Sequence, residues 1–115
     1  SGGESQRVKL AYFLSRENSM TNRLFIFDEP TTGLHVYDIE KLLKSFSALI
    51  SKGHTVLVVE HNMDLVKCAD WVIDLGPGAG DEGGSCCYCG TPEGLAQRSD
   101  LATGLALRSK IPVQQ

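Results

Sequence analysis

Apolar residues recur along the chain in two patterns, as short unbroken runs and at helical steps of three and four residues. Residues 24–27 and 56–59 are unbroken apolar runs, which are typical of strands buried on both faces of a sheet. Residues 36–52 instead place apolar side chains at helical spacing, and Gly53 follows where a helix end favours glycine. We therefore predict buried strands at 24–27 and 55–59 and a helix at 36–52.

Weaker patterns predict the other elements. The first helix is expected to bury Val8, Ala11, Tyr12 and Leu14. This first helix is predicted at 3–17, and a short helix at 62–69. Strands are predicted at 71–75 and 85–89, joined by a glycine-rich hairpin at 76–84. A last helix, which Thr91 caps and Pro92 begins, is predicted to run to about residue 98. The tail from residue 99 fits no single element. Because strands and helices alternate, we predict an α/β fold with a mostly parallel sheet flanked by helices.

Length and composition narrow the class of protein. The chain has 115 residues and a formal net charge of −3, which bounds the fold to one domain or less. Its apolar runs are far shorter than the ~20 residues of a membrane span. Because no apolar signal stretch opens the chain, we expect a cytoplasmic protein. The first residue is Ser1 rather than Met, as expected of a chain that has been processed or cut from a longer one.

The acidic charge is concentrated in the middle of the chain. Residues 60–100 carry eight acidic and two basic side chains. Binding to a DNA backbone needs clustered Lys and Arg. If the protein binds DNA, we therefore do not expect this segment to make most of the contacts.

Four cysteines raise the question of a zinc site. They are Cys68, Cys86, Cys87 and Cys89. Structural zinc sites usually pair two Cys-x-x-Cys knuckles at a distance, and the sequence has no second knuckle. We predict no zinc ligands here and interpret the cysteines as reduced thiols, with zinc as the alternative.

Polar side chains suited to phosphate chemistry follow the two predicted buried strands. Asp28 and Glu29 come directly after the first strand, and Glu60 and His61 after the second. Ligands of open α/β sheets bind at the carboxyl ends of the strands, and an apolar run ending in Asp-Glu is the Walker B pattern. Such an Asp holds Mg²⁺, usually through water, while the Glu activates the attacking water and a neighbouring His contacts the γ-phosphate.

Each of these residues also has a structural alternative. Asp28 and Glu29 could form a turn or helix cap, and a lone His61 could be a structural loop residue. Glu60 is expected to be a surface or loop-orienting carboxylate. The functional interpretation is favoured because the residues occur together, in order, at strand ends.

A glycine pair precedes the first helix. Ser1, Gly2, Gly3 and Glu4 open the chain. Glycines let a backbone approach a ligand closely, and the amides and dipole of a helix N-terminus favour an anion. Ser-Gly-Gly alone is usually a linker, but followed by Glu-Ser-Gln-Arg and a helix it becomes a specific signal.

Together these motifs resemble the ABC ATPases. Residues 1–7 resemble the signature motif, residues 24–29 the Walker B strand, residues 31–35 the D-loop, and His61 the switch histidine. More narrowly, residues 28–35, 59–62, 69–77 and 90–93 resemble the UvrA family, the damage-recognition subunits of the bacterial excinuclease. The resemblance covers nearly all of residues 1–98.

The resemblance implies roles for individual residues. It makes Glu29 and His61 catalytic and Asp28 the Mg²⁺ ligand, all three serving the nucleotide of their own module. The nucleotide-contacting set is Ser1, Gly2, Gly3, Glu4, Asp28, Glu29, Gly33 and His61, with the signature residues serving a nucleotide on an opposing module. The implied cofactors are ATP and Mg²⁺, and the implied partners of the parent are damaged DNA, UvrB and a second copy. Residues 1–98 would be a partial ABC ATPase domain, from the end of the second module, and residues 99–115 a C-terminal tail.

The sequence contains no Gly-x-x-x-x-Gly-Lys-Ser/Thr loop. We therefore expect a truncated P-loop NTPase-like fold without its Walker A part, and a chain that alone neither binds ATP tightly nor hydrolyses it. An unpaired sheet edge is expected to promote non-native self-association. The alternatives are a fragment of an ABC transporter's nucleotide-binding subunit, and a structural or interaction fragment without catalysis.

Overall fold

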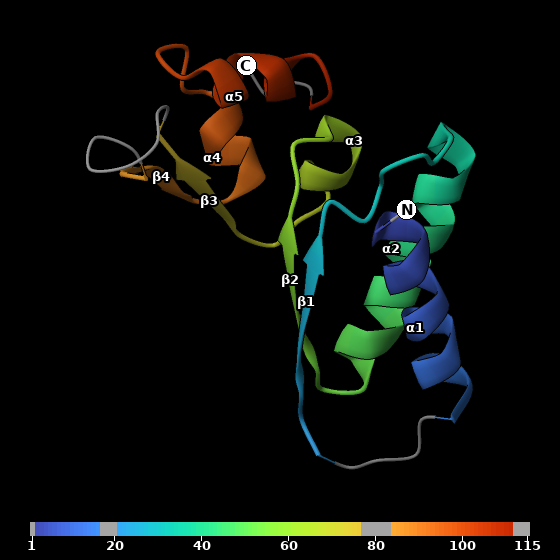
Figure 1. Ribbon diagram of the computed structural model, residues 1–115. Coiled ribbons are helices and arrows are strands. Elements are labelled where there is room, and N and C mark those ends of the chain that lie inside the picture. Colours follow the sequence, from blue (N-terminus) through green and yellow to red (C-terminus); the bar gives the residue numbers. More distant parts are fainter. Residues whose placement is uncertain (1, 17–20, 77–83, 112–115) are drawn as a thin grey trace. The chain divides into compact units, whose positions relative to one another are not determined.

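The computed structural model describes residues 2–16, 21–76 and 84–111 (Figure 1). It divides into two compact units, Ser1–Asn62 and Met63–Gln115. The elements in chain order are α1 (Gly2–Arg16), β1 (Leu24–Asp28), α2 (Val36–Ser51), β2 (Thr55–Val59), α3 (Met63–Val66), β3 (Val72–Leu75), β4 (Cys86–Gly90), α4 (Pro92–Ala96) and α5 (Ala102–Arg108). The predicted α/β class is confirmed. Most of the predicted hairpin at 76–84 lies outside the described residues.

The first unit is a parallel strand pair with two helices. β1 and β2 pair in parallel, with Leu24 opposite Thr55 and Asp28 opposite Val59. In Figure 1, α1 and α2 lie side by side next to this pair. α2 packs its apolar stripe inward, as its helical spacing predicted, and Phe46 contacts Phe27 of β1 with ring centroids 4.9 Å apart. The unit therefore has its core between the strand pair and the helices.

The buried face of α1 is not the predicted one. Val8 and Tyr12 are each 63% exposed, whereas Leu10 is buried and Phe13 and Leu14 are half-buried. Leu10, Phe13 and Leu14 follow the three- and four-residue spacing that keeps side chains on one side of a helix. The prediction is wrong for Val8, Ala11 and Tyr12, which are exposed, and holds for Leu14, because both faces of this helix carry apolar residues.

The strands β1 and β2 are buried on one face only. Phe27 is buried, but Leu24, Ile26, Leu57 and Val59 are between 46% and 62% exposed. Alternate residues of a strand point to opposite faces, and among the described residues the helices of this unit cover one of them. The prediction of strands buried on both faces is therefore wrong for the chain as it stands.

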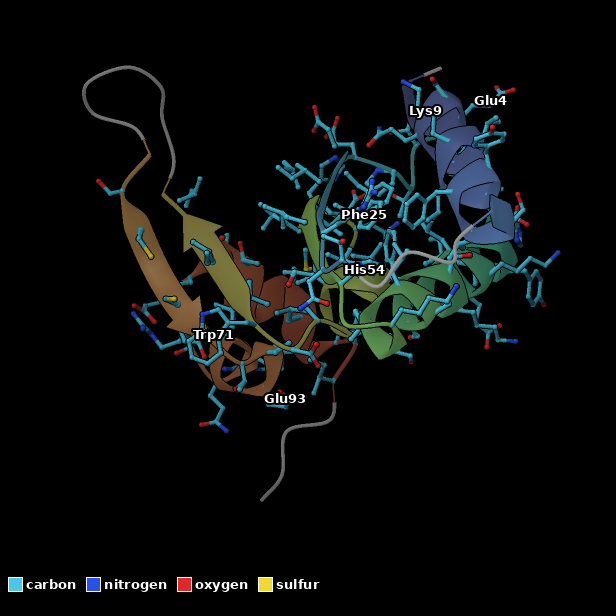
Figure 2. All side chains as sticks on the ribbon, turned by 90° about the horizontal axis from the view of Figure 1, so that it is seen from below. Glu4, Lys9, Phe25, His54, Trp71 and Glu93 are labelled. Carbon is cyan, nitrogen blue, oxygen red and sulfur yellow. The ribbon has the colours of Figure 1, made fainter. Side chains whose placement is uncertain are left out.

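An aromatic cluster closes the end of the first unit away from the strand carboxyl ends. Figure 2 shows Phe25 beside the buried His54, and their ring centroids are 5.3 Å apart. Phe13 from α1 packs edge-on against both rings. The amide of Arg23 donates to His54 Nδ1 at 3.0 Å. His54 thus fixes the start of β1 through both packing and hydrogen bonding.

The second unit has an antiparallel strand pair and three short helices. β3 pairs with β4, with Val72 opposite Gly90 and an irregularity between Asp74 and Leu75. Leu95 and Ala96 of α4 and Leu107 of α5 form its fully buried cluster. Partly buried apolar residues surround that cluster: Met63, Val66, Val72, Tyr88, Leu101 and Ile111. The strands of the described chain therefore form one parallel and one antiparallel pair, where a mostly parallel sheet was predicted.

Helix ends follow the chemistry of the sequence. Thr91 caps α4 by accepting from the Gly94 amide at 3.1 Å, and Pro92 is its first residue, which confirms the predicted start. Gly53 has a φ of +92° after α2, as expected of a glycine that ends a helix. None of the helices in the described ranges combines the length and apolarity needed to cross a bilayer.

Candidate active site

The predicted catalytic residues meet at the carboxyl ends of β1 and β2. Glu29 continues the parallel ladder one step past β1, since its amide donates to the Val59 carbonyl at 2.8 Å. His61 follows β2, and its Nε2 lies 2.9 Å from Glu29 Oε1. Both side chains are accessible, with exposed fractions of 83% for His61 and 50% for Glu29. The strand register therefore places a carboxylate and an imidazole together where a ligand can reach both.

The backbone at Glu29 is unusual. Its φ is +48°, the left-handed region that L-residues other than glycine rarely adopt. The following turn holds it there, because the Glu29 carbonyl accepts from Thr32 Oγ1 at 2.8 Å and from the Thr32 amide at 3.2 Å. Strained backbone of this kind is found preferentially at functional sites.

Glu60 organises the loops on either side of the Glu29–His61 pair. Its Oε2 accepts from Thr31 Oγ1 at 2.8 Å and from the Thr31 amide at 3.3 Å. Its Oε1 accepts from the amides of His61 and Asn62 at 3.1 and 3.3 Å. One carboxylate thus ties the segment after β1 to the segment after β2, which confirms the loop-orienting role predicted for Glu60.

Two residues of α1 that were not predicted as site residues also reach this edge. Gln6 bonds both the amide and the carbonyl of Asp28, and Arg7 donates to the carbonyls of Pro30 and Thr32. Their position within the signature-like motif was the one available signal. A side chain that bonds backbone more than twenty residues away leaves no periodic pattern in the sequence.

The signature-like glycines have different surroundings. A Cβ at Gly2 would meet no atom within 4 Å, so this position is open to an incoming group. A Cβ at Gly3 would lie 2.8 Å from Arg7 Nη1 and 3.3 Å from the Thr32 carbonyl oxygen. A side chain at Gly3 would therefore require the end of the Arg7 side chain to move and the Thr32 carbonyl to shift by a few tenths of an ångström. Glu4 lies in the first turn of α1, and Ser1 lies outside the described residues.

The D-loop segment turns immediately after Glu29. Gly33 has a φ of +78°, which favours glycine for backbone reasons alone. His35 then caps α2, its Nδ1 accepting from the Tyr37 amide at 3.4 Å. A nucleotide contact from Gly33 stays a prediction.

Metal-binding capacity at this edge rests on carboxylate oxygens. Asp28 is exposed and directly precedes Glu29, and oxygen ligands are those that Mg²⁺ prefers. Within the described ranges no three His, Cys, Asp or Glu side chains gather into a group that could hold a metal alone. A single exposed carboxylate suits Mg²⁺, which usually keeps several of its water ligands when a protein binds it. Elsewhere, Cys68, Cys86, Cys87 and Cys89 are free thiols.

Comparisons with known proteins identify relatives of the chain. No family model matches it. It is 51% identical over 108 residues to the UvrABC system protein A of Clostridium perfringens, a match covering 94% of this chain and 11% of that protein. The proteins of the same name from Aquifex aeolicus and Rickettsia typhi are 52% and 55% identical over 94% of this chain, which covers 12% and 11% of their lengths.

The fold agrees with the sequence match. The structure resembles the crystal structure of UvrA2 from Deinococcus radiodurans with a TM-score of 0.84 and 44% identity, covering 96% of this chain and 14% of that one. The chain spans only 11–12% of the length of the curated relatives named above. Its resemblance to one segment of the UvrA family, indicated by its motifs, is thereby confirmed both by sequence and by fold.

Proposed function

We propose that this chain supplies the Walker B, D-loop, switch and signature elements of an ATP-hydrolysing site in a UvrA-type protein. The observation that carries the proposal is the Glu29–His61 contact of 2.9 Å, directly after Asp28 at the ends of two parallel strands. Open α/β sheets bind their ligands at this edge. The similarity to UvrA supports assigning the nucleotide to that edge.

The proposed roles follow from the chemistry of each group. Glu29 orients the attacking water and takes its proton, and His61 holds the Glu29 carboxylate and contacts the terminal phosphate. Asp28 holds Mg²⁺ through water, and the bound ion would offset negative charge on the phosphates. Ser1, Gly2, Gly3, Glu4 and Gly33 would contact nucleotide, with the signature residues serving the opposing module.

The parent function is part of the same proposal. Because the chain matches about a ninth of its relatives' length, we propose that it works within a complete UvrA-type protein, as the end of the second ATPase module. That protein would recognise damaged DNA, load UvrB in an ATP-dependent way, and act as a dimer. Residues 1–98 would belong to the ATPase domain and residues 99–115 to its tail. The relatives named above are UvrA proteins, which favours this proposal over a transporter subunit.

The central test replaces the proposed base in the complete protein. Glu29→Gln keeps the shape of the side chain but cannot accept a proton, so we expect ATP binding to persist and steady-state hydrolysis to fall by about 10²- to 10⁴-fold. Glu40→Gln, on the exposed side of α2, is the matched control and should hydrolyse ATP normally. Wild-type turnover in Glu29→Gln would refute the role of Glu29.

A second test uses the 115-residue chain by itself. Without a phosphate-cradling loop and its lysine, most nucleotide affinity is expected to be missing. Titration calorimetry with Mg·ATP should therefore detect no binding at micromolar concentrations. Micromolar affinity in the isolated chain would show that these elements bind nucleotide without the loop.

A further inference from the structure

Gln6 and Arg7 project from α1 onto the backbone that follows β1. Gln6 Nε2 donates to the Asp28 carbonyl at 2.7 Å, and Gln6 Oε1 accepts from the Asp28 amide at 2.6 Å. Arg7 Nη1 donates to the carbonyls of Pro30 and Thr32 at 2.6 and 3.2 Å. Four hydrogen bonds from two adjacent side chains thus converge on residues 28–32, where the Walker B carboxylates stand.

The Gln6 carboxamide takes the place of a neighbouring strand at Asp28. In the described part of the chain β1 pairs with β2 alone, so the outer edge of β1 has no strand partner. A primary amide offers one acceptor and two donors. Here it forms hydrogen bonds with both the backbone amide and the backbone carbonyl of Asp28, as a peptide group of a neighbouring strand would. Gln6 therefore fixes the orientation of the Asp28 peptide relative to α1.

Arg7 does the same for the turn after Glu29. Its guanidinium carries donors in a fixed planar arrangement, and one nitrogen bonds two carbonyls on either side of Thr31. Gly3 leaves just enough room, because a Cβ there would lie 2.8 Å from the Arg7 nitrogen. A Cβ at Gly3 would also lie 3.3 Å from the Thr32 carbonyl oxygen, so the start of α1 packs closely against the D-loop backbone.

Packing of α1 does not require these two polar residues. Leu10, Phe13 and Leu14 supply its apolar contacts. Gln6 and Arg7 both lie about one turn before Leu10 and one turn after the glycines of the signature-like motif. Their bonds therefore determine where the start of the helix stands relative to Asp28 and Glu29.

We propose that Gln6 and Arg7 are positioning residues that join the signature turn and the segment 28–32 into one rigid piece. This inference rests on the proposed ATPase function and deepens it. A nucleotide contacted by Gly2 on the opposing module would then be coupled through Gln6 and Arg7 to the carboxylates serving the chain's own nucleotide. The two half-sites of the chain thus move together, with neither residue touching a reacting atom.

The kinetic test compares three methionine variants of α1 in the complete UvrA-type protein. Gln6→Met and Arg7→Met remove the hydrogen bonds while keeping long, helix-compatible side chains. Since small misplacements of catalytic groups cost up to about 100-fold, we expect kcat to fall about 10- to 100-fold, with KM for ATP within about twofold. Lys9→Met, an exposed position on the same helix, is the matched control and should keep the wild-type kcat.

Conservative variants separate positioning from general damage to the fold. Arg7→Lys keeps a cationic donor and should restore most of the kcat lost in Arg7→Met. Gln6→Glu keeps the acceptor for the Asp28 amide but lacks the donor for its carbonyl, so its kcat should lie between those of wild type and Gln6→Met. Equal loss in Arg7→Lys and Arg7→Met would overturn the positioning role of Arg7.

Hydrogen exchange provides a measurement that does not depend on turnover. In the complete protein, peptides that contain Asp28 should exchange at least tenfold faster in Gln6→Met than in Lys9→Met. Unchanged exchange and unchanged kcat in Gln6→Met, with Glu29→Gln inactive, would overturn this inference and leave the proposed function standing. Wild-type hydrolysis in Glu29→Gln would instead refute the proposed function, and the positioning role with it.

Discussion

The segment around Glu29 in the first unit and the apolar core of the second unit are held by different kinds of contact. In the first unit, polar side chains hold the segment around Glu29, and the key contacts run from Gln6, Arg7 and Glu60 to backbone groups. In the second unit the central contacts are apolar, with Leu95 and Leu107 fully buried. The comparison shows that an exposed segment can be fixed without being buried, provided that side chains satisfy its backbone.

That difference has a physical basis. Burial of apolar surface stabilises the folded state but does not depend on the orientation of the side chains. A hydrogen bond, in contrast, requires a defined orientation of both partners. A site that must present Asp28 and Glu29 to solvent at defined angles gains more from the second kind of contact. A unit with no assigned chemistry, such as residues 63–115, can rely on the first.

The largest expected effect tests the apolar core of the second unit. Leu107→Ala should destabilise the second unit by about 2–5 kcal/mol, because it leaves a cavity beside Leu95. Leu105→Ala, on the same helix but 51% exposed, should cost far less. Urea unfolding followed through Trp71, the single tryptophan of the chain and part of this unit, measures both variants. Equal effects would mean that the Leu95–Leu107 cluster is not the core.

A smaller effect tests the hydrogen bonds that hold the loops around Glu29. Glu60→Ala removes the acceptor of four hydrogen bonds, and we expect local destabilisation of the segments around Thr31 and His61 by about 1.5–3 kcal/mol. Amide exchange of residues 28–34 and 60–62 measures it. Glu40 is an exposed residue of α2, and Glu40→Ala should change the free energy of local opening, measured by amide exchange, by less than about 0.5 kcal/mol. If the two variants behave alike, Glu60 does not organise these loops.

The smallest expected effect concerns a surface ion pair in the second unit. Arg98 donates to both carboxylate oxygens of Asp100 at 2.8 and 2.9 Å, and these hydrogen bonds lower the pKa of Asp100 to about 2. Because the folded-state pKa is depressed, the pair stabilises the fold above about pH 4, and this contribution is lost as the pH falls towards 2.

NMR titration of the carboxyl carbons measures this pair. Arg98→Ala should raise the pKa of Asp100 towards its unperturbed value of 3.8, while its own backbone hydrogen bond still lowers that pKa. The pKa of Asp64, which a hydrogen bond from Lys110 lowers, should not move and serves as an internal control. An Asp100 pKa that stays near 2 in the variant would assign the shift to its own backbone contacts.

Most elements could be predicted from the sequence because their signals are local. The apolar spacing of α2, the run of β2 and the cap at Thr91 each lie within a few residues, and all three are observed. The burial of β1 could not be predicted in the same way. A run of four apolar residues indicates that both faces suit apolar cover, but it does not indicate where that cover comes from.

The candidate site shows the same division. Asp28, Glu29 and His61 were predictable because parallel strands bring their carboxyl ends to one edge. The bonds from Gln6 and Arg7 were not, because they depend on how α1 lies against a loop more than twenty residues away. Their polar side chains are used to bind backbone groups of that loop.

The left-handed backbone at Glu29 means that the residue best for thermal stability and the residue proposed for activity differ at this position. Glycine adopts a φ of +48° without strain, while a residue with a side chain there costs on the order of 1 kcal/mol. A library randomised at position 29 and selected only for heat resistance should therefore accumulate glycine. The same library in the complete protein, selected for ATP hydrolysis, should return glutamate, because the proposed mechanism needs a carboxylate at this position.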